Sequence, residues 1–395
     1  MIPVSQALAH AIHNLPLQPV ETIPLTQAPG RTLATHLASP LDHPLFDQSA
    51  VDGYAFRFAD LATHASLRQV AEVRAGSTAQ VSIGPGECTR IFTGAAVPVT
   101  ADTVIMQEYT SVQGPEVTLA DERLKIGGNI RRRGEQIEEG AVALRTGETI
   151  NPATIGFLAS LGIKKVTVRK PVRVAILVTG DEFAASSDDL KRGKIFESNG
   201  QMLQSALTRA GITAEFRMVP DDFPATVSLV EIAAEKNDLL LITGGVSVGK
   251  YDFTRPALED NGFGIVFHKV NQKPGKPLLY ARRGDQAAFG LPGNPRSVLV
   301  AFYHYVLPHL DTRLGKVAIG RPQLALPLAH DYRKKDDGKA HFVTGTIKAG
   351  RAAISPGLGS HMLQSFARAT ILIHLPGDQS TYTAGTSVTV ELLPQ

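Results

Sequence analysis

The chain has 395 residues, with 40 Lys and Arg against 37 Asp and Glu, and 43% of its residues are hydrophobic. A net charge of +3 argues against non-specific binding to nucleic acid or membranes, and the apolar content excludes a disordered chain. The single cysteine, Cys88, excludes an internal disulfide and a cysteine-based zinc site. No apolar run is long enough to span a membrane, and residues 1–15 lack the features of a secretory signal. We therefore expect a cytoplasmic protein of about two to three domains.

The first 150 residues predict a helix followed by a β-rich module. Helical spacing of apolar residues covers 4–15, and short strands and turns follow up to residue 45. From 66 to 150, short apolar segments alternate with Gly and Pro turns, which is typical of a small β module. Its expected strands are residues 70–73, 80–83, 88–92, 103–108 and 116–119. A further helix is predicted over 150–163.

Strands alternate with helices between residues 171 and 318. The expected strands are 172–178, 213–219, 238–242 and 287–291, and the expected helices are 198–210, 224–236, 254–261 and 294–310. This alternation indicates an α/β domain with a doubly wound, mostly parallel sheet. After residue 320 the pattern returns to short strands, so the predicted fold class is α/β with additional small β-rich modules.

Three of the predicted strands run directly into glycine-rich loops. These loops are Thr179-Gly180-Asp181-Glu182, Thr243-Gly244-Gly245-Val246-Ser247-Val248-Gly249 and Pro292-Gly293-Asn294-Pro295. The carboxyl ends of parallel strands form a ligand crevice, and glycine lets backbone N–H groups approach an anion. The loops predict a site for a phosphate-bearing ligand, unless the glycines only form tight turns. The chain contains neither a P-loop nor a dinucleotide-binding motif.

Charged residues near these loops extend the prediction. Lys273-Pro274-Gly275-Lys276-Pro277 holds two lysines around a Pro-Gly turn and follows Lys269, which suggests either an anion site or a solvated basic turn. Carboxylates beside a phosphate site suggest a divalent metal, although Asp181 or Asp221 could instead cap a helix. The candidates are Asp181, Glu182, Asp221, Asp222 and Asp252.

Other side chains carry weaker signals. The twelve histidines show no metal-binding spacing, and Ser247 has neither a GxSxG motif nor a nearby base, so a hydrolase triad is unsupported. Arg131-Arg132-Arg133 could bind an anion or face solvent. The segments 47–55 and 92–95 contain turn signals that mean little alone.

Several segments together resemble one known family, MoeA, over nearly the whole chain. They are Ser49-Ala-Val-Asp52-Gly-Tyr-Ala55, Arg90-Ile-Phe-Thr93-Gly-Ala95, Asn129-Ile-Arg-Arg-Arg-Gly-Glu135, Thr179-Gly-Asp-Glu182, Thr243-Gly-Gly-Val-Ser-Val-Gly249, Lys273-Pro-Gly-Lys-Pro277, Leu291-Pro-Gly-Asn-Pro295 and Gly359-Ser-His-Met-Leu363. This family comprises the molybdopterin molybdenumtransferases and the matching domain of gephyrin.

The resemblance implies an enzyme that inserts molybdate into adenylylated molybdopterin, releasing AMP, with Mg²⁺ as the assisting ion. It implies an elongated homodimer of four-domain subunits, a possible contact with the molybdopterin adenylyltransferase, and no nucleic-acid or membrane partner. The implied parts are a dimerisation domain (1–45 and 140–170), an inserted β-rich domain (46–139), an α/β domain that binds the substrates (171–318) and a C-terminal β domain (319–395).

The resemblance also assigns residues. Glu182, Asp221 and Asp252 match acidic residues that matter for activity, and Glu182 and Asp252 are the expected metal ligands. Asp52 and Thr93 would be contributed by the partner subunit. The expected binding residues for the pterin, the adenylyl group and molybdate are Thr179, Gly180, Gly244, Gly245, Ser247, Gly249, Lys269, Lys273, Lys276, Pro277, Pro292, Gly293, Pro295 and Ser360.

Three positions depart from the family pattern: Gln136 replaces an Asp, Phe196-Glu197-Ser198-Asn199 replaces Tyr-Asp-Ser-Asn, and an arginine is missing near Thr344. These departures leave room for a paralogue of altered affinity. The alternatives to the molybdenum-inserting enzyme are the adenylyltransferase of the same pathway, which shares the α/β domain, and a non-catalytic molybdopterin-binding scaffold.

Overall fold

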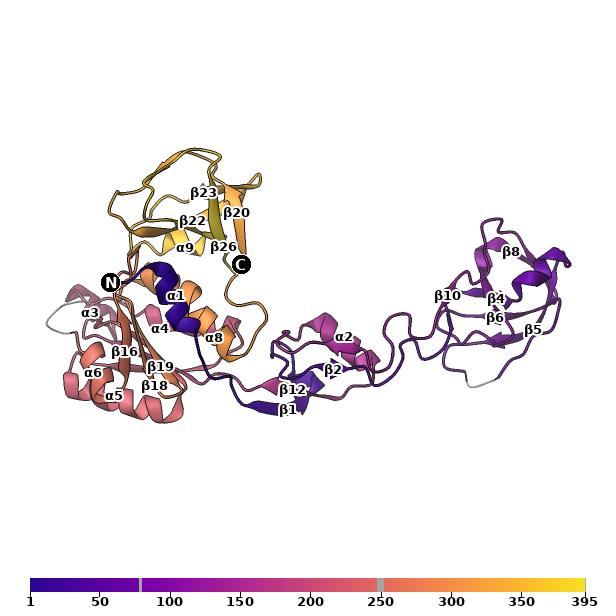
Figure 1. The fold of residues 1–395 in the computed structure, drawn as a ribbon, viewed down its shortest axis with the longest axis horizontal. Helices are drawn as coiled ribbons and strands as arrows, with labels where there is room; N and C mark the ends of the chain where they lie inside the picture. The colour runs from indigo at the N-terminus through magenta and orange to yellow at the C-terminus, as the bar shows by residue number, and fades with distance from the viewer. Residues whose placement is uncertain (78–79, 247–251, 395) are drawn as a thin grey trace. The chain divides into compact units, whose positions relative to one another are not determined.

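A computed structural model of the chain describes residues 1–77, 80–246 and 252–394 (Figure 1). The chain forms two compact units. The first contains Met1–Thr35, Thr146–Asn151 and Val166–Gln395, and the second contains His36–Arg145 and Pro152–Lys165. The four domain ranges proposed from the sequence stay a prediction.

The first unit is built on a six-stranded sheet with the order β14-β13-β15-β19-β18-β16. Strands β13, β14, β15 and β19 are parallel, β18 runs antiparallel to β19, and the edge strand β16 pairs antiparallel with β18. Their bounds are β13 Val174–Thr179, β14 Ala214–Val219, β15 Leu239–Thr243, β16 Gly264–His268, β18 Leu279–Arg283 and β19 Gln286–Leu291. The mixed α/β architecture and the mostly parallel sheet predicted from the sequence are confirmed, with the antiparallel edge as an addition.

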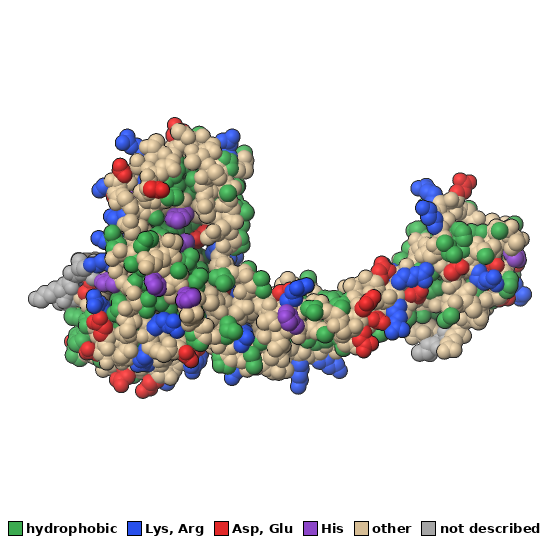
Figure 2. All heavy atoms as spheres, in the orientation of Figure 1, with side chains coloured by type: hydrophobic (Ala, Val, Ile, Leu, Met, Phe, Trp, Pro, Cys, Tyr) green, Lys and Arg blue, Asp and Glu red, His purple; other side chains and the backbone are tan. Residues whose placement is uncertain are grey.

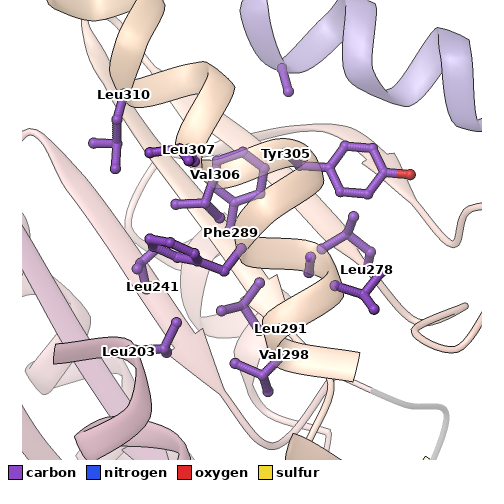
Figure 3. Close-up of a cluster of buried hydrophobic side chains, with 14 of the residues drawn as sticks. Leu203, Leu241, Leu278, Phe289, Leu291, Val298, Tyr305, Val306, Leu307 and Leu310 are labelled. Carbon is purple, nitrogen blue, oxygen red and sulfur yellow. The ribbon is translucent and has the colours of Figure 1, made fainter. Parts of the chain in front are cut away.

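Helices cover both faces of this sheet because the central strands are apolar on both sides. Ala175, Leu177, Leu240 and Ile242 face α5 and α6, and the alternate residues of the same strands pack against α1, α4, α7 and α8. Figure 3 shows the core on the side of α1, α4, α7 and α8, where Leu241, Phe289 and Leu291 meet Val306 and Leu310. The helices of the unit's α/β part are α1 Val4–Ile12, α3 Ser187–Lys191, α4 Asn199–Arg209, α5 Phe223–Lys236, α6 Thr254–Asp260, α7 Pro295–Ala301, the π-helix η4 Phe302–Val306 and α8 Leu307–Arg313.

The C-terminal residues form a second sheet with the order β17-β22-β24-β26-β20, and β23 pairs with β22. Strand β17 is only Gln272–Lys273, and it comes from the α/β part of the chain to lie parallel to β22, which places Lys273 opposite His341. The other bounds are β20 Gln323–Pro327, β21 Tyr332–Arg333, β22 Ala340–Lys348, β23 Arg351–Ile354, α9 Gln364–Ala367, β24 Ile371–Leu375, β25 Thr381–Tyr382 and β26 Ser387–Leu392. A short pair, β1 (Val20–Pro24) with β12 (Lys165–Arg169), and the 3₁₀ turn η1 (Leu25–Gln27) complete the unit.

The second unit is the β-rich module. Its main sheet has the order β7-β4-β6-β5-β9-β8 and encloses two small apolar cores. The bounds are β2 Leu37–Ala38, β3 Gln48–Ser49, β4 Gly53–Phe56, η2 Phe58–Ala62, β5 Leu67–Val73, β6 Glu87–Ile91, β7 Thr103–Met106, η3 Gln107–Tyr109, β8 Thr110–Gln113, β9 Glu116–Leu119, β10 Ile130–Arg131, β11 Val142–Leu144 and α2 Pro152–Ser160. The strand expected over residues 80–83 was wrong: these residues form an irregular segment in which the backbone N–H of Ile83 donates to the Thr100 hydroxyl instead of a sheet ladder.

Candidate functional site

The glycine-rich loops gather at the carboxyl edge of the parallel strands. In the strand register, Thr179 lies beside Val219, and Thr243 lies beside Leu291. The backbone N–H of Gly180 donates to the Val219 carbonyl over 3.2 Å, and that of Gly244 donates to the Leu291 carbonyl over 3.4 Å. The three predicted loops therefore leave the sheet next to one another. Ser247 and Gly249 lie outside the described residues.

Gly244 occupies a position that only glycine suits. Its φ is +95°, and a Cβ atom there would lie 2.5 Å from the carbonyl oxygen of Thr179. The first and second loops consequently touch through their backbones. At Gly180 the neighbour is a side chain, because the Glu182 carboxylate folds over this glycine, with Oε2 2.1 Å from where a Cβ would be.

Asn199 connects the second and third loops, although the sequence analysis did not assign it to the site. Its Nδ2 donates to the Thr243 hydroxyl over 3.0 Å and to the Gly293 carbonyl over 2.8 Å. The sequence feature that could have identified Asn199 is the segment Phe196-Glu197-Ser198-Asn199, which resembles a family segment but was given no role. Glu197 accepts a hydrogen bond from the backbone N–H of Gly200 and so caps α4.

Carboxylates meet beside the first loop. The backbone N–H of Asp221 donates to Asp181 Oδ1 over 3.3 Å. Burial raises the pKa of Asp221, and the negative charges of Glu182 and Asp181 raise it further. Asp222 acts as the N-cap of α5, since its Oδ2 accepts from the Ala225 N–H. The cap of α5 is thus Asp222 and not Asp221, and Asp181, Glu182 and Asp221 form a cluster of like charge.

This cluster has the right chemistry for a divalent cation. Mg²⁺ prefers carboxylate oxygens and commonly uses only one or two of them, together with water and substrate phosphates. Among the residues that the structure describes, no three His, Cys, Asp or Glu side chains form a ready-made ligand set. The described carboxylates therefore suit an ion that arrives with a phosphate ligand. Asp252 is half-buried and borders the segment 247–251.

The lysine turn lines a separate cavity of about 600 Å³. One wall comes from the turn and the third loop, and the other comes from the C-terminal sheet and its loops. The lining includes Lys273, Lys276, Pro277, Pro292, Ser297, Arg296, Lys334, Lys335, Lys339, His341 and Ser360. The two predicted lysines and Ser360 thus share one cationic cavity. Lys269 is not among the described residues that line it; its backbone, with φ +75°, pairs with Ile2 and Leu278.

Gln272 fixes the shape of the lysine turn. This fully buried side chain donates through Nε2 to the carbonyls of Pro274, at 3.1 Å, and Gly275, at 3.3 Å, and accepts from the Tyr305 hydroxyl. Gly275 has a φ of +81°, which the turn requires. The Lys276 carbonyl also accepts from the N–H groups of Val270 and Leu278. A turn anchored in this way is not a loose solvated loop.

Two further cavity residues were missed by the sequence analysis. Lys334 is buried, and its Nζ donates to the Lys339 carbonyl over 3.1 Å. His341 Nε2 lies 3.1 Å from Asp337 Oδ1. Burial lowers the pKa of His341, against the opposing effect of the hydrogen bond to Asp337. Both residues follow residue 320, in a region where short β strands offered no chemical motif.

In the second unit, the predicted pair Asp52 and Thr93 is in contact. Asp52 Oδ1 accepts from both the backbone N–H and the hydroxyl of Thr93, each over 2.8 Å. These hydrogen bonds lower the pKa of Asp52, and the charge of Arg90 adds to this effect. Of the basic run, Arg132 and Arg133 form ion pairs with Asp47 and Asp42. On the face drawn in Figure 2, Lys and Arg lie among Asp and Glu rather than forming a surface of one sign.

Known proteins similar to this chain cover its full length. Three family models match: the MoeA N-terminal region (domains I and II) over residues 2–162, a probable molybdopterin binding domain over 175–312, and the MoeA C-terminal region (domain IV) over 327–393. The molybdopterin molybdenumtransferase of Haemophilus influenzae is 33% identical and covers 99% of this chain and 98% of the relative. That of Bacillus subtilis is also 33% identical, covering 99% and 94%. The crystal structure of a molybdopterin biosynthesis MoeA protein from Pyrococcus horikoshii superimposes over 100% of both chains with a TM-score of 0.86 and 29% identity.

Proposed function

This chain belongs to the MoeA family, and we propose from that premise that it is a molybdopterin molybdenumtransferase of molybdenum cofactor biosynthesis. In the proposed reaction the two dithiolene sulfurs of adenylylated molybdopterin bind molybdenum in place of molybdate oxygen, which leaves as water, and a water molecule cleaves the phosphoanhydride and so releases AMP. The observation that carries the proposal is the pairing, in one unit, of glycine-rich loops at the carboxyl edge of the sheet with a cationic cavity of about 600 Å³.

The two sites suit two anions. The N–H groups of Gly180 and Gly244 pair with the sheet, so the N–H groups of Gly245 and Gly293, further along the loops, would hold the phosphate and adenylyl groups. Lys273 and Lys276, held by the rigid turn, would bind the tetrahedral molybdate dianion. Much of the rate gain would come from placing two anions together that otherwise repel each other. No protein nucleophile is needed.

A divalent cation, for which we propose Mg²⁺, would be held by Glu182 and Asp252, with Asp221 close by. When bound, such an ion offsets phosphate charge and polarises the phosphoanhydride. Burial raises the pKa of Asp221 and the charges of Glu182 and Asp181 raise it further; a cation beside these carboxylates would relieve the repulsion.

We also propose that the protein is a cytoplasmic homodimer in which Asp52 and Thr93 of one subunit complete the site of the other. The hydrogen-bonded pair is exposed, so it is available to a ligand. No helix in the described part of the chain is long and apolar enough to cross a membrane. We further propose a contact with the adenylyltransferase, which would deliver the adenylylated substrate.

The function is tested by supplying adenylylated molybdopterin, molybdate and Mg²⁺ and measuring AMP release together with active cofactor. AMP release that depends on molybdate supports the proposal. Consumption of ATP with unmodified molybdopterin would indicate the adenylyltransferase instead, and binding without turnover would indicate a scaffold.

A further inference from the structure

Two arginines of the first unit are almost completely buried, and their surroundings differ. Arg313 is 4% exposed, and its Nη1 donates to the carbonyls of Asp285, at 2.8 Å, and Asp238, at 3.3 Å. The carboxylates of Asp238 and Asp285 also favour its charge. Arg296 is 1% exposed, and in the described part of the chain no carboxylate favours its charge; the Tyr332 hydroxyl is neutral near pH 7, because burial raises its pKa.

The guanidinium of Arg296 has hydrogen-bonding capacity that the described protein does not use. Its Nη2 donates to the Phe342 carbonyl over 3.3 Å. Neither Nε nor Nη1 has a hydrogen-bond partner among the described residues. Burial lowers the pKa of Arg296, which measures how poorly this environment solvates the cation.

A buried cation without a countercharge is costly, and proteins normally pair it. Arg296 lines the same cavity as Lys273, Lys276 and Ser360. A dianion that enters this cavity would supply a countercharge for Arg296 and would accept hydrogen bonds from its unused N–H groups. Charge-assisted hydrogen bonds of this kind are among the strongest that proteins make.

We propose that Arg296 is an additional oxyanion-binding residue, which meets a tetrahedral dianion from the side of α7 while the lysine turn holds it from the other. The inference rests on the proposed function insofar as molybdate is the expected dianion. On this proposal, the buried charge of Arg296 destabilises the free protein, and binding of the dianion removes that destabilisation.

The test measures molybdate binding directly, by calorimetry and by the thermal stabilisation that molybdate confers, in wild type, Arg296→Met and Arg296→Lys. We expect Arg296→Met to raise the Kd for molybdate about tenfold or more and to leave the free protein at least as stable as wild type. Arg296→Lys should also bind molybdate more weakly, because a point charge replaces a planar donor group. The Kd for AMP should stay within about twofold in both variants, since the loops after β13 and β15, where we place AMP, are not among the described residues that line this cavity.

The matched control is Arg313→Met, which removes a buried arginine outside this cavity. It should destabilise the protein, because the carbonyls of Asp238 and Asp285 lose their donor and their carboxylates lose a nearby positive charge, and it should leave the Kd for molybdate unchanged. Unchanged molybdate binding in both Arg296 variants would overturn the inference. A second outcome separates the two proposals. If wild type binds molybdate but releases no AMP, and both Arg296 variants lose molybdate binding, this inference is supported and the proposed function is contradicted.

Discussion

The side-chain amide of Asn199 donates to the hydroxyl of Thr243, with Nδ2 and Oγ1 3.0 Å apart, at the point where β15 ends. Because the same Nδ2 also reaches the Gly293 carbonyl, one buried residue at the start of α4 holds two ligand loops in register. The site is thus organised by a residue that carries no charge and performs no chemistry of its own.

Replacing Asn199 by Ala should therefore affect both stability and ligand affinity. It leaves the buried Thr243 hydroxyl and the Gly293 carbonyl without this donor, which costs about 1–3 kcal/mol. We expect this loss in urea unfolding, together with weaker AMP binding in calorimetry, because the loops lose their fixed spacing. Wild-type stability and AMP affinity in Asn199→Ala would show that the hydrogen bonds are incidental.

Lys276→Ala should separate the two anions. The substitution removes a cavity cation but leaves the turn anchored by Gln272, so the molybdate concentration for half-maximal AMP release should rise about tenfold or more. The affinity for adenylylated molybdopterin should change much less. Equal losses for both ligands would argue against the lysine turn as the molybdate site.

The proposed sharing of sites between subunits predicts complementation. Glu182→Gln and Asp52→Asn should each abolish turnover with the fold intact, since both keep the side-chain shape and remove only its charge. When equal amounts of the two variants are mixed and allowed to exchange subunits, about half of the dimers are hybrids, and one of the two sites in each hybrid regains both carboxylates. The mixture should therefore have about a quarter of wild-type activity. A mixture as inactive as its components would contradict the shared site, and full activity of Glu182→Gln alone would remove Glu182 from the catalytic residues.

The buried His309 predicts how stability responds to acid. Burial lowers its pKa from 6.5 to about 3, while the hydrogen bond from Nδ1 to the Ala11 carbonyl opposes this and the charges of Arg313 and Arg282 reinforce it. The unfolded chain thus takes up a proton below about pH 6.5 that the folded chain refuses until about pH 3. The contribution of the neutral His309 to the free energy of unfolding is fully present above pH 6.5. It is lost as the pH falls from 6.5 to about 3, by about 1.4 kcal/mol per pH unit.

The measurement is urea unfolding at several pH values in wild type and His309→Gln. The variant keeps a donor for the Ala11 carbonyl but has no proton to gain, so its stability should fall less steeply with acid than that of wild type. Identical slopes in the two proteins would show that His309 has the same pKa in the folded and the unfolded chain.

The carboxyl edge of the sheet was predictable because fully apolar strands lead directly into glycines, a local pattern with a general structural meaning. Arg296 was not predictable, because a charged residue after Pro295 normally faces solvent. The burial of Arg296 depends on the C-terminal sheet, where the Phe342 carbonyl on β22 accepts its hydrogen bond. The same strand carries Thr344, near which the arginine of the family pattern is missing. Strand β17 was missed for a similar reason: two residues carry no periodicity, and their pairing with β22 joins distant parts of the chain.

The central claim, that the lysine turn and the C-terminal sheet enclose an oxyanion site, is tested most directly by crystals soaked in molybdate and AMP, with molybdenum located by its anomalous scattering. We predict a molybdenum peak in the cavity lined by Lys273, Lys276, Arg296 and Ser360, with AMP on the loops after β13 and β15. A peak at another place on the protein, with this cavity still free of the anion, would contradict the account.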